Sequence, residues 1–249
     1  MKIDQLKSST PSVFATQQLP TLSNRYVFVP TMDILENFEN AGWKIASATQ
    51  VGKSSYGVHE IRLRNGDLPA VGDTLVEAII RNSHNGMCSL KVSAGLHRLV
   101  CSNGLTVPTS TAESFKVRHQ SFDLDDVKRL TDSFASKLPK IEMSVNRMME
   151  KELTTDEKIE FLRNSAKVRF GQERVLSNLE MFNLLAPKRV EDEGNDLWRV
   201  FNVVQENFVR GGVQIKSPKG RNTKLRGLKN VMALNKVNTK LWELAEEMI

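Results

Sequence analysis

The amino-acid sequence predicts an α+β protein, with an antiparallel sheet of hairpins in its N-terminal half and helices in its C-terminal half. Apolar and polar residues alternate in segments between residues 44 and 118, whereas beyond residue 120 apolar residues recur at spacings of three and four. Turn signals such as Asn65-Gly66 and Ser102-Asn103-Gly104 separate the alternating segments. Strands that precede helices, instead of alternating with them, are typical of this class.

The predicted sheet begins after a short helix. This amphipathic helix covers Asp33–Trp43, and we expect Thr31 to cap its start and Gly42 to end it. The strands are then expected at residues 44–51, 57–65, 73–82 and 90–101, with short edge strands at 105–107 and 115–118.

Five stripes of apolar residues at helical spacing predict five helices in the C-terminal half. The first runs from residue 127 to 148, and Pro139 should kink or split that helix. A second helix starts at Thr154 or Thr155, and a third presents Val175, Leu179 and Phe182. The last two cover residues 196–210 and 228–249; their tryptophans, Trp198 and Trp242, are expected in the core.

These patterns divide the chain into three regions. Residues 1–22 are rich in Ser, Thr, Gln and Pro, so we expect a flexible N-terminal segment. Residues 23–120 form the mainly β region, and residues 121–249 form the helical region. Within the latter, Gly, Ser, Pro and Lys at residues 211–226 predict a mobile basic loop.

Composition excludes several classes of protein. No apolar stretch approaches the roughly 20 residues that cross a bilayer, and no apolar signal segment is expected in the first 20 residues. The two cysteines, Cys88 and Cys101, are too few for a disulfide framework, so we expect a cytoplasmic protein with free thiols. Neither a phosphate-binding glycine loop nor a metal-ligand spacing is present, so no cofactor is expected.

One segment of the chain is strongly basic. Between Asn207 and Trp242 there are nine Lys and Arg residues and no Asp or Glu, although the whole chain carries only +6 and its remainder therefore −3. Such a segment indicates a partner with many negative charges, such as the phosphates of nucleic acid. The alternative is a solvated helix face joined to a loop.

The expected nucleic-acid contacts come from this segment and from the sheet. Basic residues at matching positions of neighbouring strands would line one face, along which a phosphodiester backbone can run. The predicted contacts are Arg81, Lys91, Arg98, Arg210, Lys216, Lys219, Arg221, Lys224, Arg226 and Lys229.

The histidines suggest a weaker candidate site. His84 lies in a polar turn, Cys88 follows it, and His97 and Cys101 lie on the predicted return strand. A cluster of these four could bind a metal or serve a nucleophile. However, Asn82-Ser83-His84-Asn85-Gly86 is also favourable turn chemistry on its own, and we prefer that interpretation.

Several of these residues also carry a family resemblance. The stretches Arg81–Gly86 and Arg98–Gly104, with Gly95 between them, resemble the phage/plasmid-like protein family of unassigned function, also called domain of unknown function 932. Leu197-Trp198, Arg210-Gly211-Gly212 and Leu241-Trp242 are similar to that family too. The resemblance implies a phage or plasmid origin and a location in the cytoplasm of a bacterial host, and it supplies no catalytic residues. The element order is also similar to that of single-strand annealing proteins of phage recombination.

The sequence thus leads to three functional hypotheses. The first is a non-enzymatic nucleic-acid-binding protein that binds or anneals single-stranded DNA and can form homo-oligomers. The alternative is a protein-binding module that inhibits or modulates a host defence or replication factor. An enzyme centred on His84 and His97 ranks last.

Overall fold

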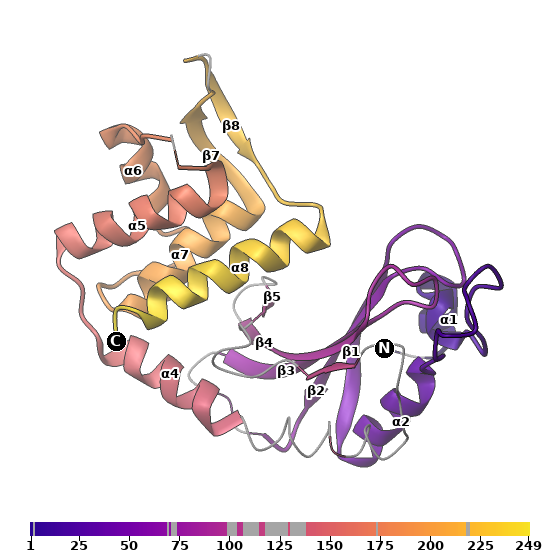
Figure 1. Cartoon of the computed structure of the whole chain (residues 1–249). Helices are drawn as coiled ribbons and strands as arrows, with labels where there is room; N and C mark the ends of the chain where they lie inside the picture. Colours follow the sequence, from indigo (N-terminus) through magenta and orange to yellow (C-terminus); the bar gives the residue numbers. More distant parts are fainter. Residues whose placement is uncertain are drawn as a thin grey trace. The chain divides into compact units, whose positions relative to one another are not determined.

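The structure is a computed structural model of the chain, and it describes residues 1, 3–68, 70, 74–98, 104–106, 115–117, 129, 138–172, 174–217 and 220–249. The chain forms two compact units, unit 1 at Met1–Lys140 and unit 2 at Ile141–Ile249 (Figure 1). Strands dominate the first unit and helices the second, so the predicted α+β class is confirmed.

Unit 1 is an antiparallel sheet with helices at its start. Helix α2 spans Thr31–Asn40. The strands are β1 Trp43–Gln50, β2 His59–Asn65, β3 Thr74–Asn82, β4 Leu90–Arg98, β5 Gly104–Thr106 and β6 Phe115–Val117. Strands β1 to β5 pair in sequence order. Along the edge of β4 that does not pair with β3, β5 pairs with residues 95–97 and β6 pairs with residues 90–92.

The first 22 residues differ from the flexible segment predicted for them. Helix α1 covers Ile3–Ser9 and a short 3-10 helix covers Pro11–Phe14. Leu6 and Val13 are buried, and the amino group of Met1 donates to the carbonyl of Ile45 on β1 at 2.7 Å. The prediction was wrong because apolar side chains spaced through a polar segment still suffice to pack it on the sheet.

The start of α2 is also different from the prediction. Pro30 is the N-cap residue, and Thr31 lies within the helix without capping it. The Thr31 hydroxyl instead accepts from Asn82 Nδ2 at 3.1 Å and lies 2.9 Å from His59 Nε2. The buried hydroxyl of Thr31 thus forms its hydrogen bonds with side chains that are distant in sequence.

Helix α4, Leu138–Glu150, contains Pro139 in its first turn, where a proline costs no hydrogen bond. Of the predicted stripe, Ile141, Val145 and Met148 are fully buried, while positions 127, 130 and 134 lie outside the described residues.

Unit 2 contains α5 Thr155–Phe170, α6 Asn178–Leu185, α7 Leu197–Arg210 and α8 Val231–Glu246, with a 3-10 turn at Val190–Asp192. Its core lies around α7, on which Phe201 and Val204 are buried. Trp198 and Trp242 meet edge to face at 6.3 Å in this core, as predicted.

A hairpin completes unit 2. Its strands are β7 Gly211–Lys216 and β8 Asn222–Arg226, which pair antiparallel between α7 and α8 (Figure 1). The mobile loop predicted for residues 211–226 is therefore wrong. Val213, Ile215 and Leu225 alternate with polar residues and give two strands, whereas Ser217 and Gly220 lie in their connection and Gly211 and Gly212 begin β7.

Candidate nucleic-acid interface

The hairpin starts directly at the end of α7, and Gly211 makes this junction. Gly211 has a φ of +72°, in the region that favours glycine. A Cβ atom built on it would lie 2.3 Å from the carbonyl oxygen of Leu225. Because β8 approaches this closely, only glycine fits, and the chain can reverse from helix to strand without a linker.

The two faces of the hairpin differ in chemistry. Val213 and Leu225 are buried on one face, where only 8% and 7% of their surface is exposed. The register and the alternation of side chains place Lys216, Lys224 and Arg226 together on the opposite face, and all three are exposed. Arg221 follows the connection between the strands and is also exposed. We call these four residues the basic hairpin face.

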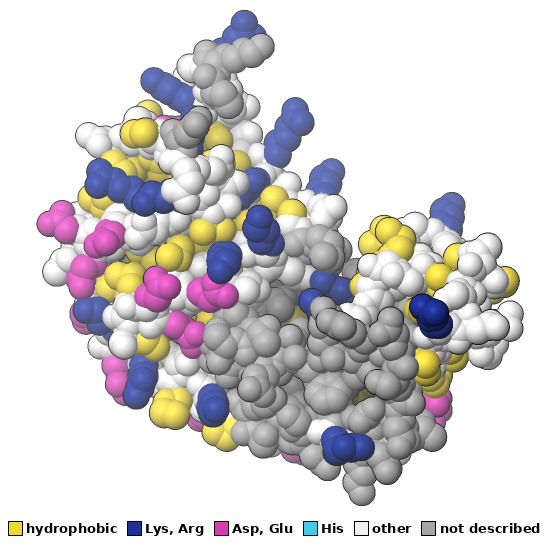
Figure 2. All heavy atoms as spheres, in the orientation of Figure 1, with side chains coloured by type: hydrophobic (Ala, Val, Ile, Leu, Met, Phe, Trp, Pro, Cys, Tyr) yellow, Lys and Arg dark blue, Asp and Glu magenta, His cyan; other side chains and the backbone are white. Residues whose placement is uncertain are grey.

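The positive charges of this face are not neutralised within the described part of the chain. No carboxylate among those residues lies within ion-pair distance of its four cations, Lys216, Arg221, Lys224 and Arg226, or of the exposed Lys229 that follows the hairpin. By contrast, Arg210 lies 3.6 Å from Glu206 and Lys240 lies 2.5 Å from Glu243. Figure 2 shows Lys and Arg projecting around the hairpin, while Asp and Glu gather around α5 and the end of α8.

Helix α6 holds the outer edge of β7. The backbone N–H of Lys216 donates to Glu180 Oε1 at 2.8 Å, and the guanidinium of Arg174 donates to the Lys216 carbonyl at 2.6 Å. The amide of Asn183 donates to the Gln214 carbonyl at 3.3 Å. These side chains satisfy backbone N–H and C=O groups on the edge of β7 that does not pair with β8, and they fix the hairpin on the helical core.

Glu180 is the centre of this arrangement. Its carboxylate also accepts from the backbone N–H of Ser177, which begins α6 in a capping box, and pairs with Arg174. Burial acts to raise the pKa of Glu180, but the hydrogen bonds from Lys216 and Ser177 and the charge of Arg174 lower it below its ordinary value. The group therefore stays ionised.

Of the predicted contacts in the sheet, the structure describes the side chains of Arg81 and Lys91. Arg81 Nη2 lies 2.6 Å from Glu60 Oε2, and only 12% of the Arg81 side chain is exposed. Lys91 is exposed and lies opposite Arg81 in the register of β3 and β4. The side chain of Arg98 and all of Lys219 lie outside the described residues.

Arg81 belongs to an ion-pair ladder that the sequence reasoning missed. Glu77 is fully buried and pairs with Arg62 at 3.0 Å and with Arg64 at 2.7 Å, and Arg62 also reaches Glu60. Alternation along each strand puts these residues on one face of the sheet, but only the register between β2 and β3 brings the opposite charges together. The contact of Arg81 with nucleic acid stays a prediction, and in this structure the charge of Arg81 is paired with Glu60.

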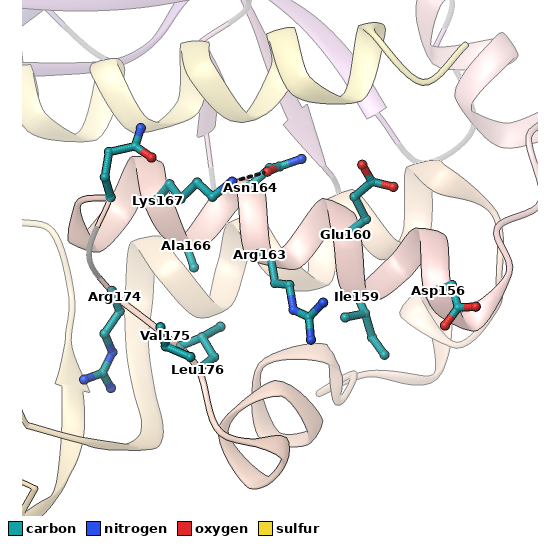
Figure 3. A pocket seen from close by; sticks show the side chains of 11 residues that line it. Asp156, Ile159, Glu160, Arg163, Asn164, Ala166, Lys167, Arg174, Val175 and Leu176 are labelled. Atoms are coloured by element: carbon teal, nitrogen blue, oxygen red, sulfur yellow. Dashed lines mark hydrogen bonds between the residues drawn. The ribbon is translucent and has the colours of Figure 1, made fainter.

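A groove lies between α5 and the segment before α6. It has a volume of about 690 Å³ and a mixed lining, in which Ile159, Ala166, Val175 and Leu176 are apolar and the other residues are polar or charged. Figure 3 shows Arg163 and Arg174 at this surface, with Asp156 and Glu160 toward the start of α5. Pockets of this size hold small organic groups.

The apolar residues predicted to face inward on α6 instead face solvent. Val175, Leu179 and Phe182 are 86%, 68% and 72% exposed, whereas Met181 and Leu184 of the same helix are buried. Ser177 caps the helix, so Val175 precedes it and the inward face is set by Met181 and Leu184. We call Val175, Leu179 and Phe182 the α6 apolar patch.

His84 and His97 have different neighbours in the structure. His84 is fully buried, 3.3 Å from the Thr31 hydroxyl, and its ring contacts those of His59 and Phe28. His97 instead lies 3.9 Å from Glu77, in the ion-pair ladder. Cys88 forms backbone hydrogen bonds with the Ser83 hydroxyl, and Cys101 and His119 lie outside the described residues.

His59 is the buried group that the sequence did not indicate. Its Nδ1 lies 2.8 Å from the Ser12 hydroxyl and 3.0 Å from the Gly57 carbonyl. Burial lowers the pKa of His59 to about 4, although the Gly57 carbonyl opposes this. The ring is therefore neutral near pH 7. Within the described residues, no three His, Cys, Asp or Glu side chains are grouped so as to hold a metal ion.

Comparisons with known proteins show the family to which this chain belongs. The family model described as "Domain of unknown function (DUF932)" matches residues 18–239, so the chain belongs to that family. It is similar to two Escherichia coli (strain K12) proteins, UPF0380 protein YafZ and UPF0380 protein YfjQ, each 28% identical over 99% of this chain and 90% of the relative. No solved structure matches the chain. No helix in the described ranges is long and apolar enough to cross a membrane.

Proposed function

We propose that this protein binds nucleic acid, most readily single-stranded DNA, through the basic hairpin face. The observation that carries the proposal is the set of exposed cations on an ordered hairpin, with no described carboxylate in ion-pair distance of them. Lys and Arg that neutralise phosphates release condensed counterions, and this release supplies most of the affinity for a nucleic-acid backbone.

The hairpin is better suited to this contact than the neighbouring helix. Along α7, residues from Leu197 to Phe208 are buried almost without exception, so this helix has no face to present to a groove of DNA. The hairpin instead projects its cations from one exposed face. Contacts of this kind position a backbone and do not read its sequence.

We infer a non-enzymatic protein that needs no cofactor, works in the cytoplasm of a bacterial host and belongs to a phage or plasmid. Formation of homo-oligomers along a strand is consistent with this role, since cooperative binding is common among single-strand binders.

The second candidate is a protein-binding module, and the α6 apolar patch favours it. Exposed apolar side chains beside basic ones would suit an acidic and partly apolar protein surface. Capture of partners from host lysate, repeated after nuclease treatment, separates the candidates. Partners that survive nuclease support the module.

The direct test is an electrophoretic mobility-shift titration with single- and double-stranded DNA, at about 50 and about 200 mM salt. The variant K216Q/K224Q/R226Q should lose most of its affinity at both salt concentrations. A matched control removes three other unit 2 charges, K151Q/K158Q/K240Q, whose side chains interact with Glu157, Asn195 and Glu243. Equal affinity of the two variants would show that the hairpin is not the site.

A further inference from the structure

The α6 apolar patch lies next to the basic hairpin face in the structure of unit 2. Arg174, whose guanidinium holds the Lys216 carbonyl, immediately precedes Val175. Leu179 is one turn before Asn183, which donates to Gln214 of β7, so Leu179 lies on the side of α6 that faces the hairpin edge. Phe182 follows on the next turn of the same helix.

Exposed apolar side chains of this size indicate that α6 contacts a partner. Leu179 and Phe182 are more than two-thirds exposed, although the same short helix buries Met181 and Leu184. Contiguous apolar surface on a soluble unit marks an interaction site. The groove of about 690 Å³, whose lining is part apolar and part charged, begins at Val175 and runs along α5 (Figure 3).

The cations beside the patch identify the chemistry of that partner. Lys216 borders it from the hairpin side and the exposed Arg163 projects at the groove, whereas Arg174 is already paired with Glu180. A duplex would offer phosphates to these cations but nothing to Phe182, because its bases are stacked inside. A single strand offers both, since its bases are free to stack on aromatic side chains.

We propose that the α6 apolar patch is a base platform for a single-stranded nucleic acid, with the phosphates held by the basic hairpin face. This inference rests on the proposed function and adds the site that makes it specific for single strands. Phe182 stacks against one base, Leu179 and Val175 contact its neighbours, and Arg174 links the two surfaces.

The test compares three fluorescein-labelled probes of equal length: oligothymidylate, an abasic strand that keeps the phosphates, and a duplex. The variants Phe182→Ala and Leu179→Ser are measured by fluorescence anisotropy beside Val51→Ser, a control that removes another exposed apolar side chain from unit 1. Thermal unfolding verifies that each variant is folded, and the patch variants should unfold like the wild type because they remove exposed groups.

The platform predicts that Phe182→Ala binds oligothymidylate about tenfold more weakly, the loss expected for one stacked base. Its affinity for the abasic strand and for the duplex should not change, and Val51→Ser should behave as the wild type. Photocrosslinking of a bromodeoxyuridine strand should modify the peptide that contains Phe182.

The failures of the two proposals are distinguishable. If K216Q/K224Q/R226Q loses DNA while Phe182→Ala and Leu179→Ser bind oligothymidylate normally, the platform is overturned and the hairpin site stands. If those patch variants change only the sedimentation of the protein, the patch is an interface with a protein or a second copy, and the platform is again overturned. If the wild type binds none of the three probes at low salt, both proposals fail.

Discussion

The carboxylate of Glu180 accepts the backbone N–H of Lys216 at 2.8 Å while it also caps the start of its own helix. One side chain thus joins the first turn of α6 to the last residue of β7. Since Arg174 completes the contact at the Lys216 carbonyl, the position of the hairpin depends on an ion pair between two residues that flank the helix cap.

Replacement of Glu180 by alanine should destabilise the protein by about 2–4 kcal/mol, because it removes a helix cap and leaves Arg174 without its carboxylate. Urea denaturation measures this loss. Glu191→Ala is the control, since Glu191 is exposed on the 3-10 turn and should cost little.

Acid should reduce the difference between wild type and Glu180→Ala. The pKa of Glu180 is lowered in the folded state from its ordinary value of 4.5, so its stabilisation is present above pH 4.5 and is lost as pH falls through the lower folded value. A difference that stays constant down to pH 3 would contradict the assignment of these contacts to the ionised carboxylate.

Gly211 and Gly212 provide a matched pair for the helix–hairpin junction. Both have positive φ angles, +72° and +83°, but a Cβ atom meets the Leu225 carbonyl only at Gly211, whereas nothing lies within 4 Å at Gly212. Gly212→Ala should therefore cost about 1–2 kcal/mol from backbone conformation alone. Gly211→Ala should cost clearly more in thermal or urea unfolding, and equal losses would show that β8 does not approach the helix end this closely.

The buried His59 predicts acid sensitivity of unit 1. Its pKa falls from 6.5 to about 4 on folding, so the neutral ring contributes stability that is complete above pH 6.5 and declines as the pH drops toward 4. The full loss is about 3 kcal/mol. Urea unfolding at pH 7, 5.5 and 4.5 measures it, and His59→Gln should have a flatter profile over that range. Wild-type stability that is level from pH 7 to 4.5 would disprove the assignment.

Much of the fold was available from the sequence. The apolar, β-branched residues at Leu75–Ile80 located β3, and the helical spacing of apolar residues at Leu197–Phe208 located α7. The charge run also located the candidate interface. What it did not show was that Lys216, Lys224 and Arg226 share one face, since that needs the register of two strands that had been taken for a loop.

Other features depend on contacts distant in sequence. The burial of Thr31 and His59, and the pairing of Arg81 with Glu60, follow from which strands and helices meet, which no local pattern reports. The apolar spacing of Val175, Leu179 and Phe182 suggested a core stripe, but periodicity gives no preference between a face that packs on the protein and one that packs on a partner.

The salt dependence of binding measures how many hairpin cations contact phosphate. Lys224 has no carboxylate of the described residues in ion-pair distance, whereas Lys240, also exposed in the same acid-free segment, is paired with Glu243. For a single-stranded probe, removal of one phosphate contact should lower the slope of log affinity against log salt by about 0.7. Lys224→Gln should show this change and Lys240→Gln should not, because a lysine that already has a carboxylate partner releases no counterion from the strand. If both substitutions reduced the slope equally, binding would follow net charge rather than the geometry of the hairpin.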